Sequence, residues 1–203
     1  MEIVGPIVSC LAFADVFLHL YLDFVKDQID KHITTSNSNS QIPQNALLIS
    51  ALTTIIAFIL VAIFSFSWLL RIELSGFLTV FLLVDTPLLL WVTGLAILSV
   101  GILLHGWSRL VRGNYAANWE LSNEQPLVTT GPYSRIRHPS YSSYFLSFIG
   151  LFLLIPSLPT LFLFSGYWGY NEIAKQEEKM LVSHFGEAYS KYMGGTGRFL
   201  PKF

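Results

Sequence analysis

The chain has 203 residues, of which 53% are apolar and only 12% are charged, and its mean hydropathy is +0.55. A typical soluble domain contains about 25% charged residues, so this composition argues against a soluble globular protein. The formal net charge of -1 provides no overall positive field, and we therefore expect a membrane protein without a nucleic-acid partner.

The first apolar segment, residues 3–25, carries Asp15, His19 and Asp23 at intervals of four residues. Side chains with this spacing lie on one face of a helix. The stripe could bind a metal ion, but a polar flank turned into a helix bundle is the better interpretation. We therefore predict a first membrane span without a metal site, and leave any role of the three residues open.

Two further spans are predicted from length and charge. A helix needs about 20 apolar residues to cross a bilayer. Residues 46–70 meet this requirement without a single charge, and a polar linker near residues 33–45 separates them from the first span. The apolar segment 77–104 is interrupted by Asp85 and Pro87, so we expect its span to begin at about Thr86.

The run from Pro139 to Asn171 contains 33 residues without Asp, Glu, Lys or Arg. It is too long for one span and short for two, and Pro156 and Pro159 lie near its centre. Because proline breaks the helical hydrogen-bond ladder, we predict a hairpin over 140–172 with arms at about 140–155 and 158–172. The three earlier spans and these two arms make five transmembrane helices in an all-α polytopic bundle, and a C-terminal helix follows them.

The basic residues orient this bundle. With five spans, 11 of the 12 Lys and Arg residues fall on one side of the membrane. The positive-inside rule makes that side cytoplasmic and places the N-terminus outside. Residues 1–104 then hold the first three spans, and residues 105–203 hold the catalytic part. The third loop and the C-terminal tail meet at the cytoplasmic face, where we expect one site.

The third loop and the tail helix contain the candidate site residues. Arg137-His138-Pro139 brings polar side chains to the start of the fourth span, although anchoring in lipid headgroups would also explain them. In the tail helix, Glu177 falls at the centre of an apolar stripe and Glu178 at its edge. A carboxylate in such a stripe needs a partner or a function, and a structural salt bridge to Arg135 or Arg137 is the alternative.

The residues of these two segments form a recognisable pattern. The first contains Leu127, Val128, Gly131, Tyr133, Arg137, His138, Pro139 and Tyr141; the second contains Glu177, Glu178, Leu181, Phe185, Gly186, Tyr189 and Tyr192; Arg198 and Pro201 close the chain. Together with the proline-centred hairpin, they resemble the isoprenylcysteine carboxyl methyltransferase family of small integral membrane methyltransferases. The resemblance covers about residues 105–203.

The resemblance implies an S-adenosylmethionine-dependent methyltransferase that acts on a lipid or prenylated substrate entering from the bilayer. The expected acceptor is the carboxylate of an isoprenylated cysteine. Arg137 and Glu177 are the expected catalytic residues. The expected cofactor-binding residues are Leu127, Val128, Gly131, Tyr133, His138, Tyr141, Glu177 and Glu178. The membrane would be the endoplasmic reticulum in a eukaryote or the cell membrane in a prokaryote; the oligomeric state is not predicted.

Two positions depart from the family pattern. Ser143 replaces a common glycine, and Ile173 stands where the family often has an arginine four residues before the first glutamate. Such an arginine would orient a substrate carboxylate, so Arg137 is the expected substitute. The departure keeps other hypotheses open: a phosphatidylethanolamine-type N-methyltransferase first, then a sterol-reductase-like enzyme or a non-catalytic membrane protein.

Overall fold

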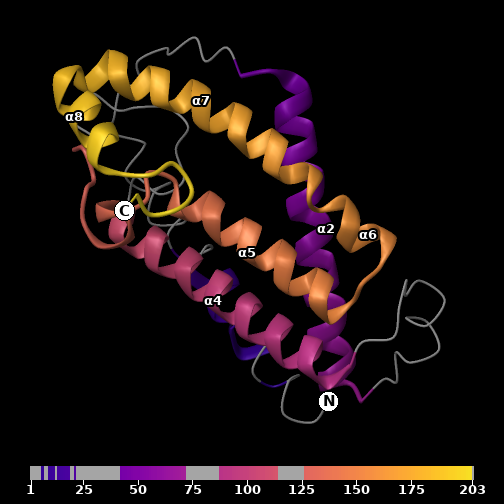
Figure 1. Ribbon diagram of the computed structural model, residues 1–203. Coiled ribbons are helices and arrows are strands. Elements are labelled where there is room, and N and C mark those ends of the chain that lie inside the picture. Colours follow the sequence, from indigo (N-terminus) through magenta and orange to yellow (C-terminus); the bar gives the residue numbers. More distant parts are fainter. Residues whose placement is uncertain are drawn as a thin grey trace.

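The computed structural model describes residues 6, 9–11, 13–18, 21, 42–71, 87–113 and 126–202. Residues 9–11 and 13–18 are helical. The later elements are α2 (Gln44–Leu69), α4 (Leu88–Arg112), η2 (Gly131–Ser134), α5 (Pro139–Leu154), α6 (Leu158–Phe162), α7 (Ser165–Phe185) and α8 (Glu187–Gly195) (Figure 1). Within the described ranges the fold is all-α, and the only β-type pairing is an isolated bridge between Ile136 and Gly197.

Two of these helices are long and apolar enough to cross a bilayer. They cover Gln44–Ser67 and Leu88–Arg112, with mean hydropathies of 2.8 and 2.2. Large apolar side chains on both helices are exposed, among them Ile55 and Leu103. A continuous apolar surface of this kind is compatible with lipid and not with water. These two helices are therefore candidate membrane spans, as the sequence predicted.

Several of the expected features lie wholly or partly outside the described residues. These are His19 and Asp23 of the polar stripe, most of the linker near 33–45, and residues 77–86. Asp15 is described, and its carboxylate lies 2.9 Å from Nδ1 of His105 on α4. This residue therefore faces the interior of the bundle.

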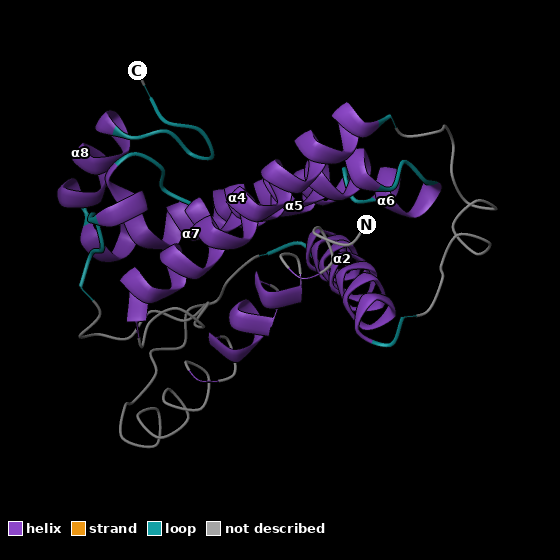
Figure 2. Ribbon diagram, turned by 90° about the horizontal axis from the view of Figure 1, so that it is seen from below, coloured by secondary structure: helices purple, strands orange, loops and turns teal. Residues whose placement is uncertain are grey.

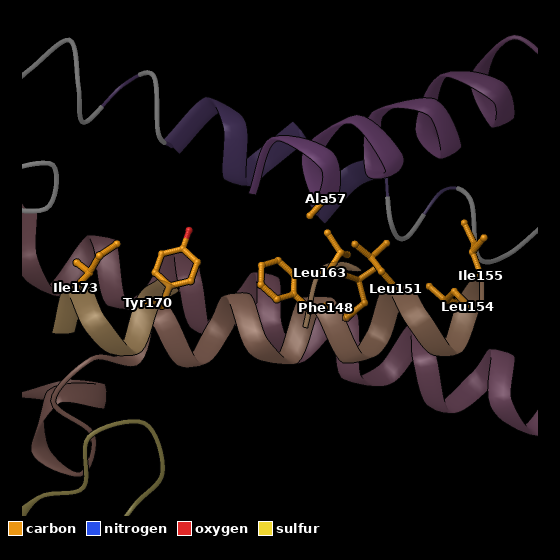
Figure 3. Packing of buried hydrophobic residues seen from close by; sticks show 9 residues of the cluster. Ala57, Phe148, Leu151, Leu154, Ile155, Leu163, Tyr170 and Ile173 are labelled. Carbon is orange, nitrogen blue, oxygen red and sulfur yellow. The ribbon is translucent and has the colours of Figure 1, made fainter. Parts of the chain in front are cut away.

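Helices α4 and α5 lie side by side along most of their length (Figure 1). The close approach depends on Gly150 of α5, because a Cβ atom there would come within 2.6 Å of the backbone nitrogen of Leu98. Residues from α2, α4, α5 and the α6–α7 region then share one core cluster: Ala57, Leu98, Phe148, Leu151, Leu154, Ile155, Leu163, Tyr170 and Ile173 (Figure 3). This packing fixes the register of the helices that carry the site.

The chain reverses direction after α5, between Ile155 and Ser157. Ser157 caps α6 through a reciprocal capping box with Thr160. The second arm differs from the expected one, because α7 continues without a break from Ser165 to Phe185. No proline occurs in that stretch, and the second arm and the predicted tail helix form a single element. That helix connects the apolar bundle directly to the two glutamates.

The C-terminal elements gather at one end of the bundle. Figure 2 shows α8 and the terminal loop beside the far end of the layer formed by α4, α5 and α7. Gly186, with φ +57°, ends α7 and turns the chain into α8. The result places the last residues of α4, the first residues of α5 and the second half of α7 around one region.

Candidate functional site

A cavity opens where α4 ends, α5 begins and the second half of α7 passes. Its wall is formed by Arg112, Pro126, Leu127, Val128, Tyr133, Arg137, His138, Glu177, Met180, Leu181, Phe185, Tyr189 and Tyr192. Of the expected site residues, the structure brings Leu127, Val128, Tyr133, Arg137, His138 and Glu177 to this wall. Gly131, Tyr141 and Glu178 are not on it. The two predicted segments therefore meet, as the sequence pattern indicated.

Glu178 lies behind the cavity and is only 4% exposed. Its Oε1 accepts a hydrogen bond from Nε of Arg137 at 2.8 Å, and its Oε2 accepts one from Nη2 of Arg198 at 2.6 Å. Burial alone would raise the pKa of Glu178, but contacts from His138, Arg198 and Arg137 outweigh it and hold the pKa well below its usual range. Glu178 is thus an anchor that is charged at neutral pH.

This position corrects the helical-wheel interpretation, which placed Glu178 at the rim. The apolar stripe of the tail helix reflects only the residues of that one helix. The stripe therefore contains no information about Arg198, which follows α8 and covers Glu178 from the other side. The stripe argument was nevertheless consistent with the wall position of Glu177.

Glu177 projects to the cavity and is more accessible, with its side chain 18% exposed. Its Oε1 accepts a hydrogen bond from the hydroxyl of Tyr141 at 2.7 Å. Tyr141 is therefore a supporting residue behind Glu177 and not part of the cavity wall. The carboxylate of Glu177 combines a fixed orientation with access to the cavity, which suits it to a positively charged ligand group.

His138 lies between the two glutamates. Its Nδ1 is 3.3 Å from Oε2 of Glu177, and its Nε2 is 3.3 Å from Oε1 of Glu178. Burial lowers the pKa of His138, but the two carboxylates outweigh burial and raise it above its ordinary value. The ring also stacks on Tyr141, with centroids 5.4 Å apart and planes at 1°. The imidazole is consequently held rigidly in a form that favours protonation.

Arg137 is already engaged by the protein. Besides its bond to Glu178, its Nη1 donates to the backbone oxygens of Met193, at 3.3 Å, and Thr196. These contacts tie the start of α5 to the end of α8. A guanidinium held in this way is poorly placed to orient a substrate carboxylate, so the expected role of Arg137 as substitute for the missing arginine loses support.

The terminal segment, residues 196–199, is bonded across residues 135–138. The backbone nitrogen of Gly197 donates to the oxygen of Arg135 at 3.1 Å, and the nitrogen of Arg137 donates back to Gly197 at 2.8 Å. The nitrogen of His138 donates to the oxygen of Arg198 at 3.0 Å. This backbone pairing holds Arg137 and His138 in place through the C-terminal segment. No pattern in the sequence predicted these hydrogen bonds.

Arg112 is a wall residue that the sequence analysis did not select. It lies in the last turn of α4, where its positive charge is favoured by the helix dipole. Among the described residues it forms no ion pair, unlike Arg137 and Arg198. Arg112 lies outside the motif that begins at Leu127, so the motif did not indicate a role for it. Met180 and Leu181, on α7, add apolar surface to the same wall.

Ile173 occupies the family's arginine position but does not reach the cavity. It is 0% exposed and belongs to the apolar core cluster. Although it lies one helical turn before Glu177, its surroundings are those of a packing residue. The region therefore has no room for a charge at this position.

Comparison with known proteins identifies the region that carries this site. Residues 89–188 match the family described as phospholipid methyltransferase. Just under half of the chain is therefore similar to that family. The match begins within α4 and ends in α8, so it includes η2, His138 and both glutamates.

Curated relatives show the resemblance stated from the motifs. Protein-S-isoprenylcysteine O-methyltransferases from Tribolium castaneum and Xenopus laevis are each 32% identical to the chain, over 113 and 115 residues. These alignments cover 53% and 54% of the chain and 40% of each relative. The Saccharomyces cerevisiae protein of that name is 32% identical over 99 residues, 48% of the chain and 39% of its own length. The chain thus spans about 40% of the length of these relatives.

Proposed function

We propose that the chain is an S-adenosylmethionine-dependent methyltransferase whose acceptor is the carboxylate of an isoprenylated cysteine embedded in the membrane. The observation that carries the proposal is the position of His138 and Glu177 in a cavity at the end of the apolar helices. The curated relatives carry names for this reaction, and the family match over residues 89–188 includes all of the cavity wall except Tyr189 and Tyr192. A water-soluble donor and a lipid acceptor can meet at such a boundary.

The cavity wall suits the chemical groups of the cofactor. S-adenosylmethionine carries a sulfonium, an ammonium, a carboxylate and an adenosine. Glu177 offers the negative charge for the cationic groups, and Tyr133 offers an aromatic face to the sulfonium. Leu127, Val128, Met180 and Leu181 offer apolar surface for the adenosine. His138 lies on the same wall with its Nδ1 facing Glu177, so a ligand in the cavity would meet the imidazole and this carboxylate together.

The bound cofactor would supply an electrophilic methyl group. The chain's own residues then need only align the reactants and exclude water, since an ionised carboxylate requires no general base. Glu177 is held by Tyr141 and His138, so its charge is oriented before any ligand arrives. Arg112 is the better candidate for orienting the acceptor carboxylate, because Arg137 is consumed by structural contacts.

We place the cavity on the cytoplasmic side and the N-terminus outside. This orientation is supported by the concentration of basic residues at the cavity end, and the fourth and fifth spans of a five-span arrangement would be α5 and the first half of α7. The membrane would be that of the endoplasmic reticulum in a eukaryote or the cell membrane in a prokaryote.

The phospholipid N-methyltransferase hypothesis retains specific support. The family of residues 89–188 is named for phospholipids, and Ile173 removes a cation that a carboxylate acceptor would use. An ammonium acceptor must lose a proton before it can attack the methyl group. Glu177 could accept that proton, whereas His138 is already biased towards its protonated form.

Cofactor binding by the purified full-length chain tests the enzyme proposal directly. Calorimetry in detergent should show binding of S-adenosylmethionine, weakened by about 1–3 kcal/mol in His138→Ala or Glu177→Gln, the typical cost of losing a hydrogen bond to a charged group. Unchanged affinity in both variants would remove these residues from the site. Absence of binding in the intact chain would favour a non-catalytic membrane protein.

The acceptor is decided by methyl transfer to a farnesylcysteine analogue and to phosphatidylethanolamine in parallel. We expect transfer to the analogue, with a raised KM in Arg112→Ala and an unchanged KM in Arg135→Ala. Arg135 is a suitable control because it is exposed and does not reach the cavity. Transfer to phosphatidylethanolamine alone would establish the alternative function.

A further inference from the structure

A second cavity, of about 220 Å³, lies between the N-terminal helical residues, α2, α4 and α5. Most of its wall is apolar: Val61 and Phe66 come from α2, Leu98 from α4 and Leu151 from α5. Since α2 and α4 are the helices long enough to span a bilayer, this cavity lies at membrane depth. It is separate from the site described above, with which it shares no wall residue.

The exposure of its wall residues shows how a ligand would enter. Phe13 and Phe66 are 48% and 50% exposed, and their rings form an edge-to-face pair at the mouth. Leu98, Phe148 and Leu151 are at most 3% exposed and form the floor. Because the apolar surface surrounding the mouth faces lipid, the cavity is accessible from the bilayer and not from water.

One part of the wall is charged and nearly buried. Nδ1 of His105 lies 2.9 Å from a carboxylate oxygen of Asp15, and the side chains of Asp15 and His105 are 10% and 5% exposed. An ionisable pair facing a cavity at membrane depth is costly and usually marks a functional site. The two oxygens of a carboxylate have about four lone-pair sites, so Asp15 can accept a hydrogen bond from a ligand alongside its protein contacts, of which His105 is one.

A second polar group on the wall points to the same conclusion. The hydroxyl oxygen of Ser65 is buried, and within the described ranges it has no hydrogen-bond partner. A fully apolar ligand would leave this hydroxyl unsatisfied. The wall is therefore better suited to a molecule with a hydrocarbon body and a small polar group.

We propose that this cavity binds a single-chain lipid with a hydrogen-bond-donating end, of the long-chain alcohol class. The hydroxyl lies against Asp15 and His105, and the chain lies between α2 and α5. A carboxylate end is disfavoured because it would meet the negative charge of Asp15. The site does not depend on the proposed methyl transfer, since α2 and Asp15 lie outside the residues that match the methyltransferase family.

The cavity has a physical connection to the other site. The ring of Tyr144, on its wall, stacks on Tyr170 at 5.1 Å, and Tyr170 contacts Tyr141 at 4.8 Å. Tyr141 in turn donates its hydrogen bond to Glu177. A lipid in the cavity would therefore contact the far end of the aromatic cluster that supports Glu177.

Photocrosslinking of the purified full-length chain in detergent tests the proposal. The probe is a hexadecanol with a diazirine in its chain, and mass spectrometry locates the labelled peptides. We expect labelling of α2 between Phe58 and Phe66. Ala62→Phe fills the cavity from its mouth and should reduce this labelling about tenfold. The matched control is Ala51→Phe, an exposed alanine of the same helix outside the cavity, which should leave labelling unchanged.

Competition defines the polar end. Unlabelled hexadecanol should displace the probe from the intact chain, and hexadecanoate should do so poorly, whereas Asp15→Asn should allow both to compete. Labelling spread evenly over the exposed helix faces and unaffected by Ala62→Phe would show that the alcohol behaves as bulk lipid, and would overturn the site. Equal competition by acid and alcohol in the intact chain would overturn the role of Asp15. Loss of labelling in His138→Ala would place the lipid in the other cavity instead.

Discussion

Arg137 and Glu178 form a buried ion pair, with 2.8 Å between Nε and Oε1, that joins the residue before His138 to the middle of α7. The two side chains are 10% and 5% exposed. Arg198 binds the other oxygen of Glu178 at 2.6 Å, so the carboxylate is compensated by cations on both sides. The pair therefore positions its chain neighbours, His138 and Glu177, while its own charges are compensated within the protein.

Removal of Glu178 should destabilise the protein. Glu178→Ala leaves Arg137 without its buried partner, and we expect a loss of about 3 kcal/mol, close to the usual cost of breaking a buried ion pair. Thermal unfolding in detergent should show a lower midpoint together with weaker cofactor binding. The control is Glu172→Ala on the same helix, which removes a more exposed pair with Lys175 and should cost less than about 1 kcal/mol. Equal shifts for both variants would contradict the anchoring role.

Stability should decline on the alkaline side through His138. Because its pKa is raised above the ordinary value of 6.5, its contribution is fully present below pH 6.5 and is lost as pH rises through the higher folded value. The pKa of Glu178 is lowered from 4.5, so its contribution is present above pH 4.5 and is lost as pH falls towards the folded value. His138→Gln should abolish the alkaline decline in unfolding midpoint, and His184→Gln, at an exposed position of α7, should retain it.

An arginine restored at residue 173 should be harmful. Ile173→Arg would bury a charge in the apolar core cluster, at a cost on the order of 3 kcal/mol or more. Ile173→Val should cost only about 0.5–1.5 kcal/mol, the usual value for removing one buried methylene. Both can be measured as unfolding midpoints. A stable Ile173→Arg variant with increased transfer to a farnesylcysteine analogue would show that the position belongs to the active site after all.

Gly197 should tolerate no side chain. A Cβ atom there would collide with the backbone oxygen of Leu200, so Gly197→Ala must displace the segment bonded to residues 135–138. We expect weaker binding of S-adenosylmethionine because Arg137 and His138 lose their external restraint. Gly194→Ala is the control, since no atom lies within 4 Å of its added Cβ. Equal affinities of the two variants would show that this segment does not position the site.

The sequence predicted the helical fold class and the meeting of the two motif segments, because both depend on local patterns. Charge-free runs indicate membrane helices, and the apolar stripe around Glu177 predicted that this residue faces the site. The position of Glu178 could not be obtained in this way. It depends on Arg198, which reaches it only after the turn at Gly186 and the whole of α8.

Arg112 and Ile173 show that tertiary packing decides which residues reach the cavity: Arg112 reaches it without a motif, and Ile173 does not reach it despite its position in the motif. Arg112 is a wall residue because α4 ends beside the Leu127 segment, a tertiary relationship that no local motif encodes. Ile173 has the right helical phase for the cavity, yet neighbouring helices cover it completely. Phase along one helix indicates a direction, but only the packing of the other helices determines what lies there.

Because α7 is continuous, a change in its tilt within the bilayer also moves Glu177 and Glu178. Tyr170, which is hydrogen-bonded to Thr54 of α2, lies seven residues before Glu177 on the same rigid helix, a rise of about 10 Å. A tilt of α7 against α2, such as a change in lipid thickness would impose, must therefore rotate Glu177 relative to His138. Substitutions at Thr54 would then appear in assays as defects of the cavity that contains Glu177, although Thr54 does not belong to its wall.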